Sequence, residues 1–394
     1  MLNIAIVGAG SRGVKCFGEL LKQRSDCVIK AICDTNKVRA KIAADTFGVE
    51  KYYTDLTAML ESETLDGLII TTPDANHEES AVNALKHGVN ILLDKPLSPS
   101  LAGCKHIIEE AKKSGKIAMM GFNLRHAPML KYLKKTIDEG TLGRIIMMEN
   151  REFYDGGRTY MARWNGKKSE SGGLWIHKGS HDFDIFNWFV NFPKPKKVSA
   201  FSGMSVFRPE CIPFEKVDGI ELGPCCSECY YGKNDICKDK ATYTDAAWGK
   251  EAQKEDGYVK DSCMYLSDLS VHDNGIAMVE YENGIRASHI ECFVTGFGDR
   301  LYTIVGTKAI AQASLAKNHI KIINRWTKEE IDIQVPVVEG GHNGADPALV
   351  DSFIKTICGE ASNTTTLEQG MLSTAIAEAA ELSKEENRTV FIEL

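Results

Sequence analysis

The sequence predicts an α/β protein with two domains: an N-terminal doubly wound parallel sheet and a C-terminal α+β domain with a large, mainly antiparallel open sheet. Over residues 1–122, short apolar runs alternate with helical patterns, which is typical of a parallel sheet with helices on both faces. Over residues 123–394, strand patterns follow one another with few helices between them. A length of 394 residues also exceeds what one small core accommodates.

The first strand pattern, residues 4–7, leads directly into Gly8, Gly10 and Gly13, and a helical pattern follows. In this context Gly8 permits a tight turn, Gly10 lets the backbone approach a pyrophosphate, and Gly13 lets the helix pack on the strand. The turn therefore predicts a dinucleotide site at the N-terminus of the helix.

The second strand pattern, residues 27–33, ends at Asp34. An acid about 20 residues after such a turn is suited to hydrogen-bond the ribose hydroxyls of adenosine, which favours NAD over NADP. The alternative is a turn that binds no nucleotide, with Asp34 acting as a helix cap.

The remaining strands of this domain end in polar segments at the same predicted edge. Ligands of doubly wound sheets bind outside the carboxyl ends of the strands, so we expect residues 8–13, 71–77 and 94–96 there. The other predicted elements are 38–47, 56–60, 67–72, 77–87, 89–93, 101–111 and 117–122.

Lys95 follows one of these strands, where we expect a nicotinamide ring. Its ammonium group could hydrogen-bond a substrate hydroxyl and stabilise an alkoxide-like transition state. An exposed loop lysine is the alternative, because most lysines are exposed.

In the second domain, the dipeptide Asn283-Gly284 between two strand patterns predicts a hairpin. The predicted strands are 145–153, 198–207, 276–281, 285–294, 301–305, 320–323, 331–335 and 390–393, and the predicted helices are 130–137, 348–357 and 367–383.

A segment of this domain, residues 172–184, contains His177 and His181 four residues apart and Asp184 three residues later. In a helix the three share a face. Asp184 could orient His181 as a general base. A metal site formed by two imidazoles and a purely structural histidine pair are the alternatives.

A polar stretch of about residues 208–265 is predicted to be an insertion into the second sheet, and it is rich in cysteine. Four thiolates there could bind a structural zinc ion. Reduced, partly buried thiols are the alternative, and an iron–sulfur cluster is a third. The four residues are Cys226, Cys229, Cys237 and Cys263.

The net charge of -7, without a basic stripe, argues against nucleic acid and anionic membranes as partners. No apolar run approaches the roughly 20 residues of a membrane helix. Because the first strand begins at residue 2, we expect no signal peptide and a cytoplasmic protein, whose twelve cysteines are mostly thiols or metal ligands.

Several of these segments, in this order, resemble the Gfo/Idh/MocA oxidoreductases over nearly the whole length. Asp94-Lys95-Pro96 stands where that family has Glu-Lys-Pro, and His177 stands where many members have Asp. The other similar segments are residues 8–13, Thr71-Thr72-Pro73 with His77, Gly121-Phe122 with Asn123 and Arg125, residues 172–184, and Arg300 with Gly306-Thr307.

The resemblance implies an NAD-binding Rossmann domain (1–122) and a substrate and oligomerisation domain (123–394), forming a homodimer or homotetramer. It implies oxidation of a hydroxyl of a sugar, cyclitol or sugar derivative, with hydride transfer to NAD. His181 would take the hydroxyl proton and Lys95 would assist, while His177 would share the base role or bind substrate. The implied cofactor residues are Gly8, Gly10, Ser11, Arg12, Gly13, Asp34, Thr71, Thr72, Pro73, His77, Asp94, Lys95 and Asn123.

Aromatic and guanidinium groups in the second domain suit a polyhydroxylated substrate. A surface loop without a binding role is the alternative. The predicted substrate residues are Arg125, Arg151, Tyr154, Arg158, Tyr160, Arg163, Trp164, Lys178 and Asp184.

Two other functions fit the same residues. Some relatives oxidise a glycoside transiently with tightly held NAD+, eliminate the aglycone and then reduce the sugar, so that the net reaction is glycoside cleavage. A non-catalytic sensor of NAD or sugar is the other, although Lys95 and His181 together argue against it.

Overall fold

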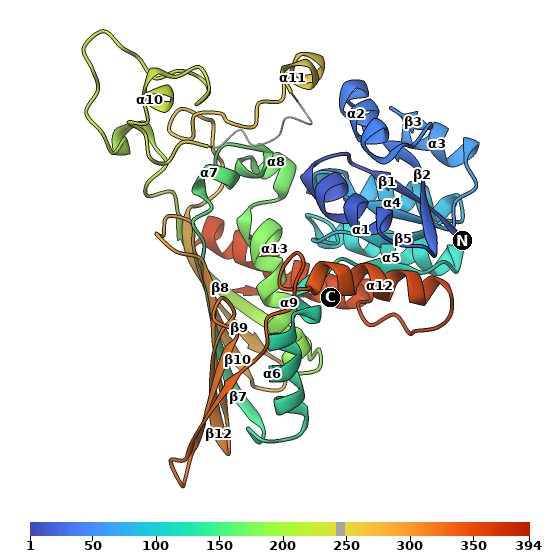
Figure 1. The fold of residues 1–394 in the computed structure, drawn as a ribbon. Helices are drawn as coiled ribbons and strands as arrows, with labels where there is room; N and C mark the ends of the chain where they lie inside the picture. Colours follow the sequence, from blue (N-terminus) through green and yellow to red (C-terminus); the bar gives the residue numbers. More distant parts are fainter. Residues whose placement is uncertain (242–248) are drawn as a thin grey trace. The chain divides into compact units, whose positions relative to one another are not determined.

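The computed structural model describes residues 1–241 and 249–394 (Figure 1). The described chain forms two compact units. The first contains residues 1–128, 249–258 and 337–374, and the second contains residues 129–241, 259–336 and 375–394. None of the helices in the described part has the length and hydropathy needed to cross a membrane.

A six-stranded parallel sheet forms the centre of the first unit, with strand order β3-β2-β1-β4-β5-β6. This confirms the predicted doubly wound sheet. Its strands are β1 (Leu2–Val7), β2 (Cys27–Cys33), β3 (Tyr52–Tyr53), β4 (Gly67–Ile70), β5 (Asn90–Leu93) and β6 (Ala118–Met120). Its helical segments are η1 (Arg12–Gly18), α1 (Glu19–Lys22), α2 (Lys37–Phe47), α3 (Leu56–Ser62), η2 (Asp74–Asn76), α4 (His77–Lys86), α5 (Leu101–Ser114), η3 (Asn123–His126), α11 (Lys250–Asp256) and α12 (Ala345–Ile357).

Apolar clusters bury both faces of this sheet. Ile6 of β1 is buried with Leu349 and Phe353 of α12, whereas its neighbour Ala5 is buried with Ile107 of α5. Successive residues of a strand point to opposite faces, so the two clusters lie on opposite sides of the sheet. Helix α12 therefore completes the core of the first unit from a position near the end of the sequence.

The sequence predicts one domain boundary, between residues 122 and 123. In the structure, the first compact unit also includes segments from later in the chain. Residues 249–258 and 337–374 pack with the first unit. An amphipathic pattern such as that of α12 shows that a helix covers an apolar surface, but it does not identify which sheet provides that surface.

The second unit contains a nine-stranded sheet with the order β14-β13-β12-β11-β7-β10-β9-β8-β15. Its neighbouring strands are antiparallel except for β7 and β10, which confirms the predicted mainly antiparallel sheet. The strands are β7 (Ile145–Phe153), β8 (Pro195–Gly203), β9 (Asn274–Tyr281), β10 (Arg286–Cys292), β11 (Asp299–Gly306), β12 (Ala309–Ser314), β13 (His319–Asn324), β14 (Glu330–Gln334) and β15 (Val390–Phe391).

The predicted hairpin joins β9 to β10, and Gly284 has the positive φ of +82° that its turn requires. The remaining helical segments are α6 (Pro128–Asp138), α7 (Gly157–Tyr160), η4 (Trp164–Gly166), α8 (Lys168–Ser171), η5 (Trp175–Gly179), α9 (Ser180–Phe189), η6 (Pro209–Cys211), α10 (Tyr230–Lys233) and α13 (Leu367–Glu386).

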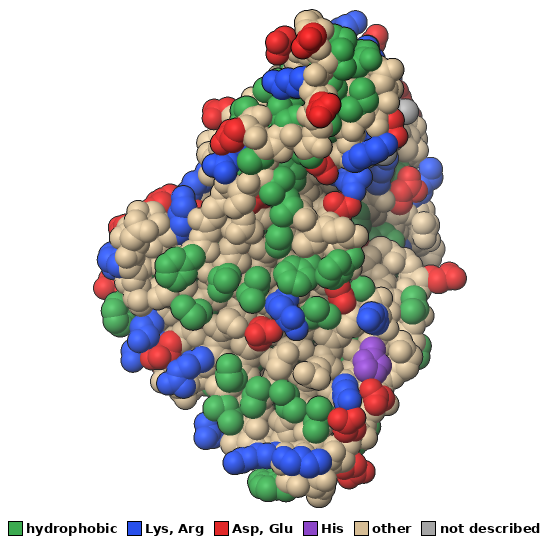
Figure 2. Space-filling model, turned by 90° about the vertical axis from the view of Figure 1, so that its left-hand side faces the viewer, with side chains coloured by type: hydrophobic (Ala, Val, Ile, Leu, Met, Phe, Trp, Pro, Cys, Tyr) green, Lys and Arg blue, Asp and Glu red, His purple; other side chains and the backbone are tan. Residues whose placement is uncertain are grey.

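One face of the nine-stranded sheet is buried and the other is open. In β9, Ala277 and Val279 are buried, whereas the alternating residues Ile276 and Met278 are 45% and 49% exposed. Phe201 of β8 pairs with Ile276 and is 70% exposed. Figure 2 shows apolar side chains gathered over this open face.

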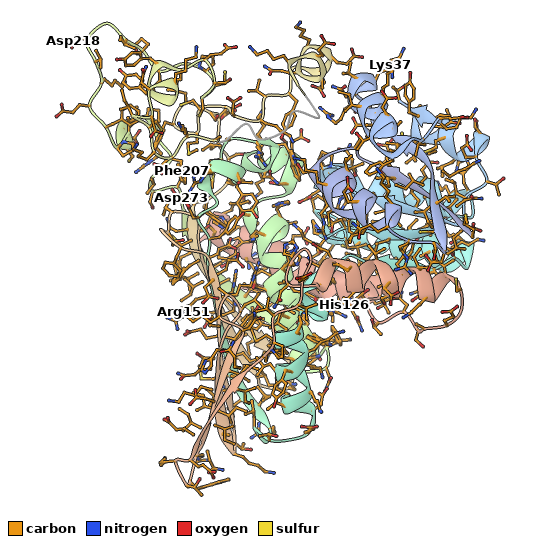
Figure 3. The ribbon with its side chains drawn as sticks, viewed as in Figure 1. Lys37, His126, Arg151, Phe207, Asp218 and Asp273 are labelled. Carbon is orange, nitrogen blue, oxygen red and sulfur yellow. The ribbon has the colours of Figure 1, made fainter. Side chains whose placement is uncertain are left out.

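The cysteine-rich insertion leaves the sheet between β8 and β9. At its root, the buried carboxylate of Asp273 accepts hydrogen bonds from the backbone N–H groups of Val206 (2.7 Å) and Phe207 (3.4 Å). Phe207 and Asp273 lie close together at this root, and Asp218 lies at the far end of the loop (Figure 3). Residues 242–248 of the predicted insertion lie outside the described residues.

Candidate functional site

In the glycine-rich turn of the first unit, two glycines have no room for a side chain, and the third has space beside it. A Cβ atom at Gly8, whose φ is +89°, would lie 2.6 Å from the backbone carbon of Thr71, and one at Gly13 would lie 2.2 Å from the oxygen of Gly8. A Cβ atom at Gly10 would have no neighbour within 4 Å. The turn therefore packs tightly on the sheet and leaves room beside Gly10, which fits the pyrophosphate of a dinucleotide.

Asp34 lies at the end of β2, and its side chain is held in place. One carboxylate oxygen accepts a hydrogen bond from the N–H of Ala9 (2.8 Å), and the other accepts from the N–H of Asn36 (2.9 Å). The guanidinium of Arg39 lies 3.0 Å from the latter oxygen. The acid is thus fixed in place beside the glycine-rich turn.

The segments after β4 and β5 are joined by His77, which is buried. Its Nδ1 lies 2.6 Å from the oxygen of Pro96 and its Nε2 lies 3.1 Å from the oxygen of Thr72. Thr71 donates a hydrogen bond from its hydroxyl to the oxygen of Gly8 (2.7 Å). These contacts bring together all three segments that the sequence places at the carboxyl edge.

Lys95 is partly buried at this edge and has an acidic neighbour that the sequence reasoning missed. Burial raises the pKa of Asp74 to about 7, against the opposing charges of Lys95 and His77. A carboxyl group with such a pKa beside an ammonium group is a feature of functional sites. Its position directly after Pro73, in a segment predicted to bind cofactor, is the signal that could have identified it.

Arg12 and Asn123, both predicted cofactor residues, are held by Asp346 at the start of α12. One carboxylate oxygen of Asp346 accepts from Arg12 (2.9 Å) and Asn123 (2.8 Å), and the other lies 2.7 Å from Nδ1 of His342. Burial opposes ionisation of Asp346, but the hydrogen bond with His342 and the charge of Arg12 hold its pKa well below the ordinary value. Arg12 also lies 3.1 Å from Asp94.

Two further predicted residues of the first unit differ in exposure. Ser11 is exposed at the entrance to η1. Arg125 is buried, and it donates hydrogen bonds to the oxygen of Thr364 (2.9 Å) and to Gln369 (2.6 Å). These contacts give Arg125 a structural role in the first unit.

In the second unit, Lys178 lies in a buried network of charges. Its ammonium is 3.0 Å from a carboxylate oxygen of Glu152 and 4.4 Å from the centre of the Tyr154 ring. Arg300 binds the other oxygen of Glu152 and lies 2.9 Å from Asp182. Two cations thus meet two carboxylates, which compensates the cost of burying them.

Glu152 and Asp182 were not predicted from the sequence. Each lies next to a predicted residue, Arg151 and His181 respectively. A carboxylate at an inward position of a strand is the signal that identifies Glu152 in retrospect, because a buried acid needs a partner of opposite charge.

His177 is buried among aromatic rings. Its ring centre lies 5.6 Å from that of Tyr160 and 5.1 Å from that of Trp164, both at nearly perpendicular angles. The amide nitrogen of Asn165 lies 2.9 Å from its Nε2. Because an amide NH₂ group only donates, Nε2 of His177 acts as the acceptor, and its lone pair is engaged.

His181 lies in the first turn of α9 and is half-buried, in contrast to His177. Asp184, three residues later on the same helix, is buried. The preceding segment, Trp175–Gly179, is a π-helical turn, as is Arg12–Gly18 in the first unit. Such turns occur frequently at functional sites, and both fall in segments for which the sequence predicts chemistry.

The structure does not bring every predicted substrate residue to this cluster. Arg151 alternates with the inward residue Glu152, so it lies on the open face of the sheet, where it pairs with Glu149 at 3.1 Å (Figure 3). Arg158 forms an ion pair with Asp155 near the surface. Arg163 is partly buried.

A second cluster of buried polar side chains, centred on Glu291, lies inside the second unit. Both oxygens of the buried Glu291 contact imidazoles, at 2.5 Å from His272 and 3.1 Å from His289. His289 in turn contacts Asn150 at 2.8 Å. Although burial opposes ionisation, the hydrogen bonds of His272 and His289 lower the pKa of Glu291 to about 2.

The structure gives no support to a zinc site. Among the described residues, no group of three or more His, Cys, Asp or Glu side chains could hold a metal ion. Instead, Cys229, Cys237 and Cys263 are buried with aromatic side chains such as Tyr231 and Tyr265. Burial raises the pKa of Cys226 to about 12 and that of Cys237 to about 11, which is typical of protonated, structural thiols.

Two family models match the chain. One, described as an oxidoreductase family with an NAD-binding Rossmann fold, matches residues 2–122. The other, described as the C-terminal alpha/beta domain of an oxidoreductase family, matches residues 134–392. The chain belongs to the Gfo/Idh/MocA oxidoreductase family. This confirms the resemblance that the separated motifs indicated.

Among curated proteins, the Bacillus subtilis protein YteT, named as an oxidoreductase, is 27% identical over 380 residues, which is 90% of this chain and 88% of YteT. The myo-inositol 2-dehydrogenase of Thermotoga maritima is 28% identical over 191 residues, covering 48% of this chain and 55% of that enzyme. The chain therefore matches about half the length of the latter enzyme.

Solved structures share the fold over the whole chain. A levoglucosan dehydrogenase in complex with NADH and levoglucosan has a TM-score of 0.76 at 18% identity, and the match covers 100% of both chains. The WlbA dehydrogenase of Bordetella pertussis, in complex with NADH and UDP-GlcNAcA, has a TM-score of 0.73 at 18% identity and covers 100% of this chain and 99% of that one.

Proposed function

We propose that this protein is an NAD-dependent oxidoreductase that oxidises a hydroxyl group of a sugar, cyclitol or sugar derivative. Family membership, relatives named as inositol and glucoside dehydrogenases, and the fold shared with NADH-bound sugar dehydrogenases support this proposal. The observation that carries it is the contrast between two histidines. His177 is buried, whereas His181 is half-buried in the first turn of α9, the helix that also carries Asp184.

In the proposed reaction, bound NAD+ supplies the acceptor for the hydride of the oxidised carbon. His181 takes the proton of the substrate hydroxyl, and the ammonium of Lys95 stabilises the negative charge that develops on its oxygen. His177 does not act as the base, because its Nε2 already accepts a hydrogen bond from Asn165. It is a positioning residue that fixes the aromatic side chains around it.

The chemistry of the second unit favours a polyhydroxylated substrate. The rings of Tyr160 and Trp164 supply apolar faces of the kind that pack against the C–H face of a sugar, and Lys178 is a cation held among aromatic rings. The two cations of this cluster, Lys178 and Arg300, are each paired with a carboxylate. Because their charges are compensated, the cluster suits the hydroxyl groups of a neutral substrate better than a strongly charged ligand.

His181→Ala tests the assignment of the base. Removing a general base costs about 10²- to 10⁴-fold in turnover, and we expect this loss with unchanged NAD affinity. His319→Ala is the matched control, since that histidine lies on β13, its side chain is 36% exposed, and it forms an ion pair with Asp332. The assay follows NADH absorbance across a panel of inositols and pyranosides, with NAD affinity measured by calorimetry.

The panel includes aryl glycosides, whose cleavage is followed by release of the aglycone. Release without net NADH would replace simple oxidation by the mechanism of transient oxidation and elimination. NAD binding without either reaction across the panel would contradict the proposed enzyme and favour a sensor. Full activity of His181→Ala would contradict the assignment of His181 as the general base, but it would leave the proposed reaction standing.

We also propose that the open face of the nine-stranded sheet joins two copies of the chain. Phe201, Ile276 and Met278 expose apolar area on this face, and monomers rarely expose large contiguous apolar patches (Figure 2).

A further inference from the structure

One helix of the cysteine-rich insertion packs in the first unit. The insertion lies between β8 and β9 in sequence, yet α11 (Lys250–Asp256) belongs to the unit that contains the glycine-rich turn. Ala252 of this helix is 1% exposed and is buried with Ala9 of the turn and with Val14 and Ala43. The position of α11 is therefore fixed by burial beside the predicted dinucleotide site.

Hydrogen bonds tie α11 to the residues that follow Asp34. The side-chain nitrogen of Asn36 donates to the backbone oxygen of Ala252 (2.7 Å), and its side-chain oxygen accepts from the N–H of Arg39 (2.9 Å). Asn36 is 1% exposed, so these hydrogen bonds are shielded from water. The cap of helix α2 and the backbone of α11 are thus joined by one side chain.

Arg39 lies between two carboxylates, and α11 supplies one of them. One guanidinium nitrogen is 3.0 Å from Asp34 and another is 2.7 Å from Asp256. The guanidinium carbon also lies 6.0 Å from the ring centre of Tyr258. Arg39, the arginine closest in sequence to Asp34, therefore has both of its outer nitrogens engaged.

We infer that α11 is a selectivity element for the adenosine end of the dinucleotide. A 2′-phosphate is bound by an arginine near the acid that ends the second strand, whereas a 2′-hydroxyl is bound by the acid itself. Asp256 holds Arg39 against Asp34 and adds a negative charge, so the phosphate of NADP finds no available guanidinium there. This inference rests on the proposed function, because it takes a nicotinamide dinucleotide as the ligand.

Asp256→Asn tests the inference without any turnover measurement. The change removes one negative charge and keeps the size of the side chain, so NADP affinity should rise about tenfold relative to NAD affinity, which corresponds to about 1.4 kcal/mol. Glu255→Gln is the matched control, because it makes the same change of charge at the neighbouring exposed position of α11. Dissociation constants for both dinucleotides are measured by titration calorimetry.

A second variant, Ala252→Arg, forces a long side chain into the buried contact of α11. We expect faster hydrogen exchange of residues 250–256 and a loss of selectivity against NADP similar to that of Asp256→Asn. An NADP-to-NAD affinity ratio equal to that of the wild type in both variants would overturn the inference, as would an equal change in Glu255→Gln. A wild-type protein that binds neither dinucleotide would instead overturn the proposed function itself.

Discussion

Gly8 and Gly10 stand two residues apart in the same turn, but alanine should have opposite effects at the two positions. At Gly8, the side chain meets the backbone of Thr71 at 2.6 Å and of Thr72 at 2.7 Å, with φ at +89°. A positive φ costs about 1–2 kcal/mol for alanine, and a clash with backbone that must shift adds about 1–3 kcal/mol. We expect Gly8→Ala to lose about 2–5 kcal/mol of the free energy of unfolding.

At Gly10, the same methyl group meets nothing within 4 Å. The free energy of unfolding should therefore change by less than about 0.5 kcal/mol. The methyl group enters the space assigned to the pyrophosphate, however, so the dissociation constant for NAD should rise at least about tenfold. This variant separates binding from folding.

The assay is a pair of measurements on each variant. Urea unfolding, followed by circular dichroism, gives the stability, and calorimetric titration gives the NAD affinity. A Gly10→Ala protein that binds NAD as tightly as the wild type would refute the placement of the phosphates beside this turn. A Gly8→Ala protein of unchanged stability would refute the packing argument.

Three further predictions concern charge and assembly. Arg300→Met removes the cation that contacts buried Asp182 and one of the two cations that contact Glu152, so we expect a loss of about 3–5 kcal/mol in urea unfolding, less in Arg300→Lys. Burial raises the pKa of Asp74 to about 7 in the folded protein, so ionisation of this group lowers the free energy of unfolding as pH rises from about 4 through 7. Asp74→Asn should abolish this loss of stability in thermal melts at different pH values. Asp45→Asn, at an exposed position, should not abolish it. Phe201→Glu should reduce the mass measured by light scattering to that of a monomer; an unchanged mass would contradict the proposed interface.

Local sequence patterns predict the first unit well because its features are short-range. The glycine-rich turn, the strand that ends at Asp34 and the parallel alternation each depend on residues within about one βα unit. The contributions of α11 and α12 could not be predicted in this way. Their burial beside Ala9 and Ile6 depends on contacts between residues far apart in the sequence.

The second unit shows how one position decides the role of a side chain. Arg151 is predicted to bind substrate from its position in the chain and its guanidinium group, but the alternation of β7 places Glu152 inward and Arg151 outward. A shift of one residue along a strand exchanges its two faces, and a strand of mixed polar residues does not show which face is buried. By contrast, the spacing of His177 and His181 is visible in the sequence itself, and the catalytic role that it indicates stays a prediction.

The burial of Phe353 against Ile6 has a consequence for biosynthesis. While a ribosome is still translating the middle of the chain, the newly made parallel sheet has one apolar face without its covering helix. That surface must be kept from aggregating until residues 345–357, which form α12, have been translated. Expression of this protein should therefore depend on chaperones more strongly than the early position of its nucleotide-binding strands would suggest.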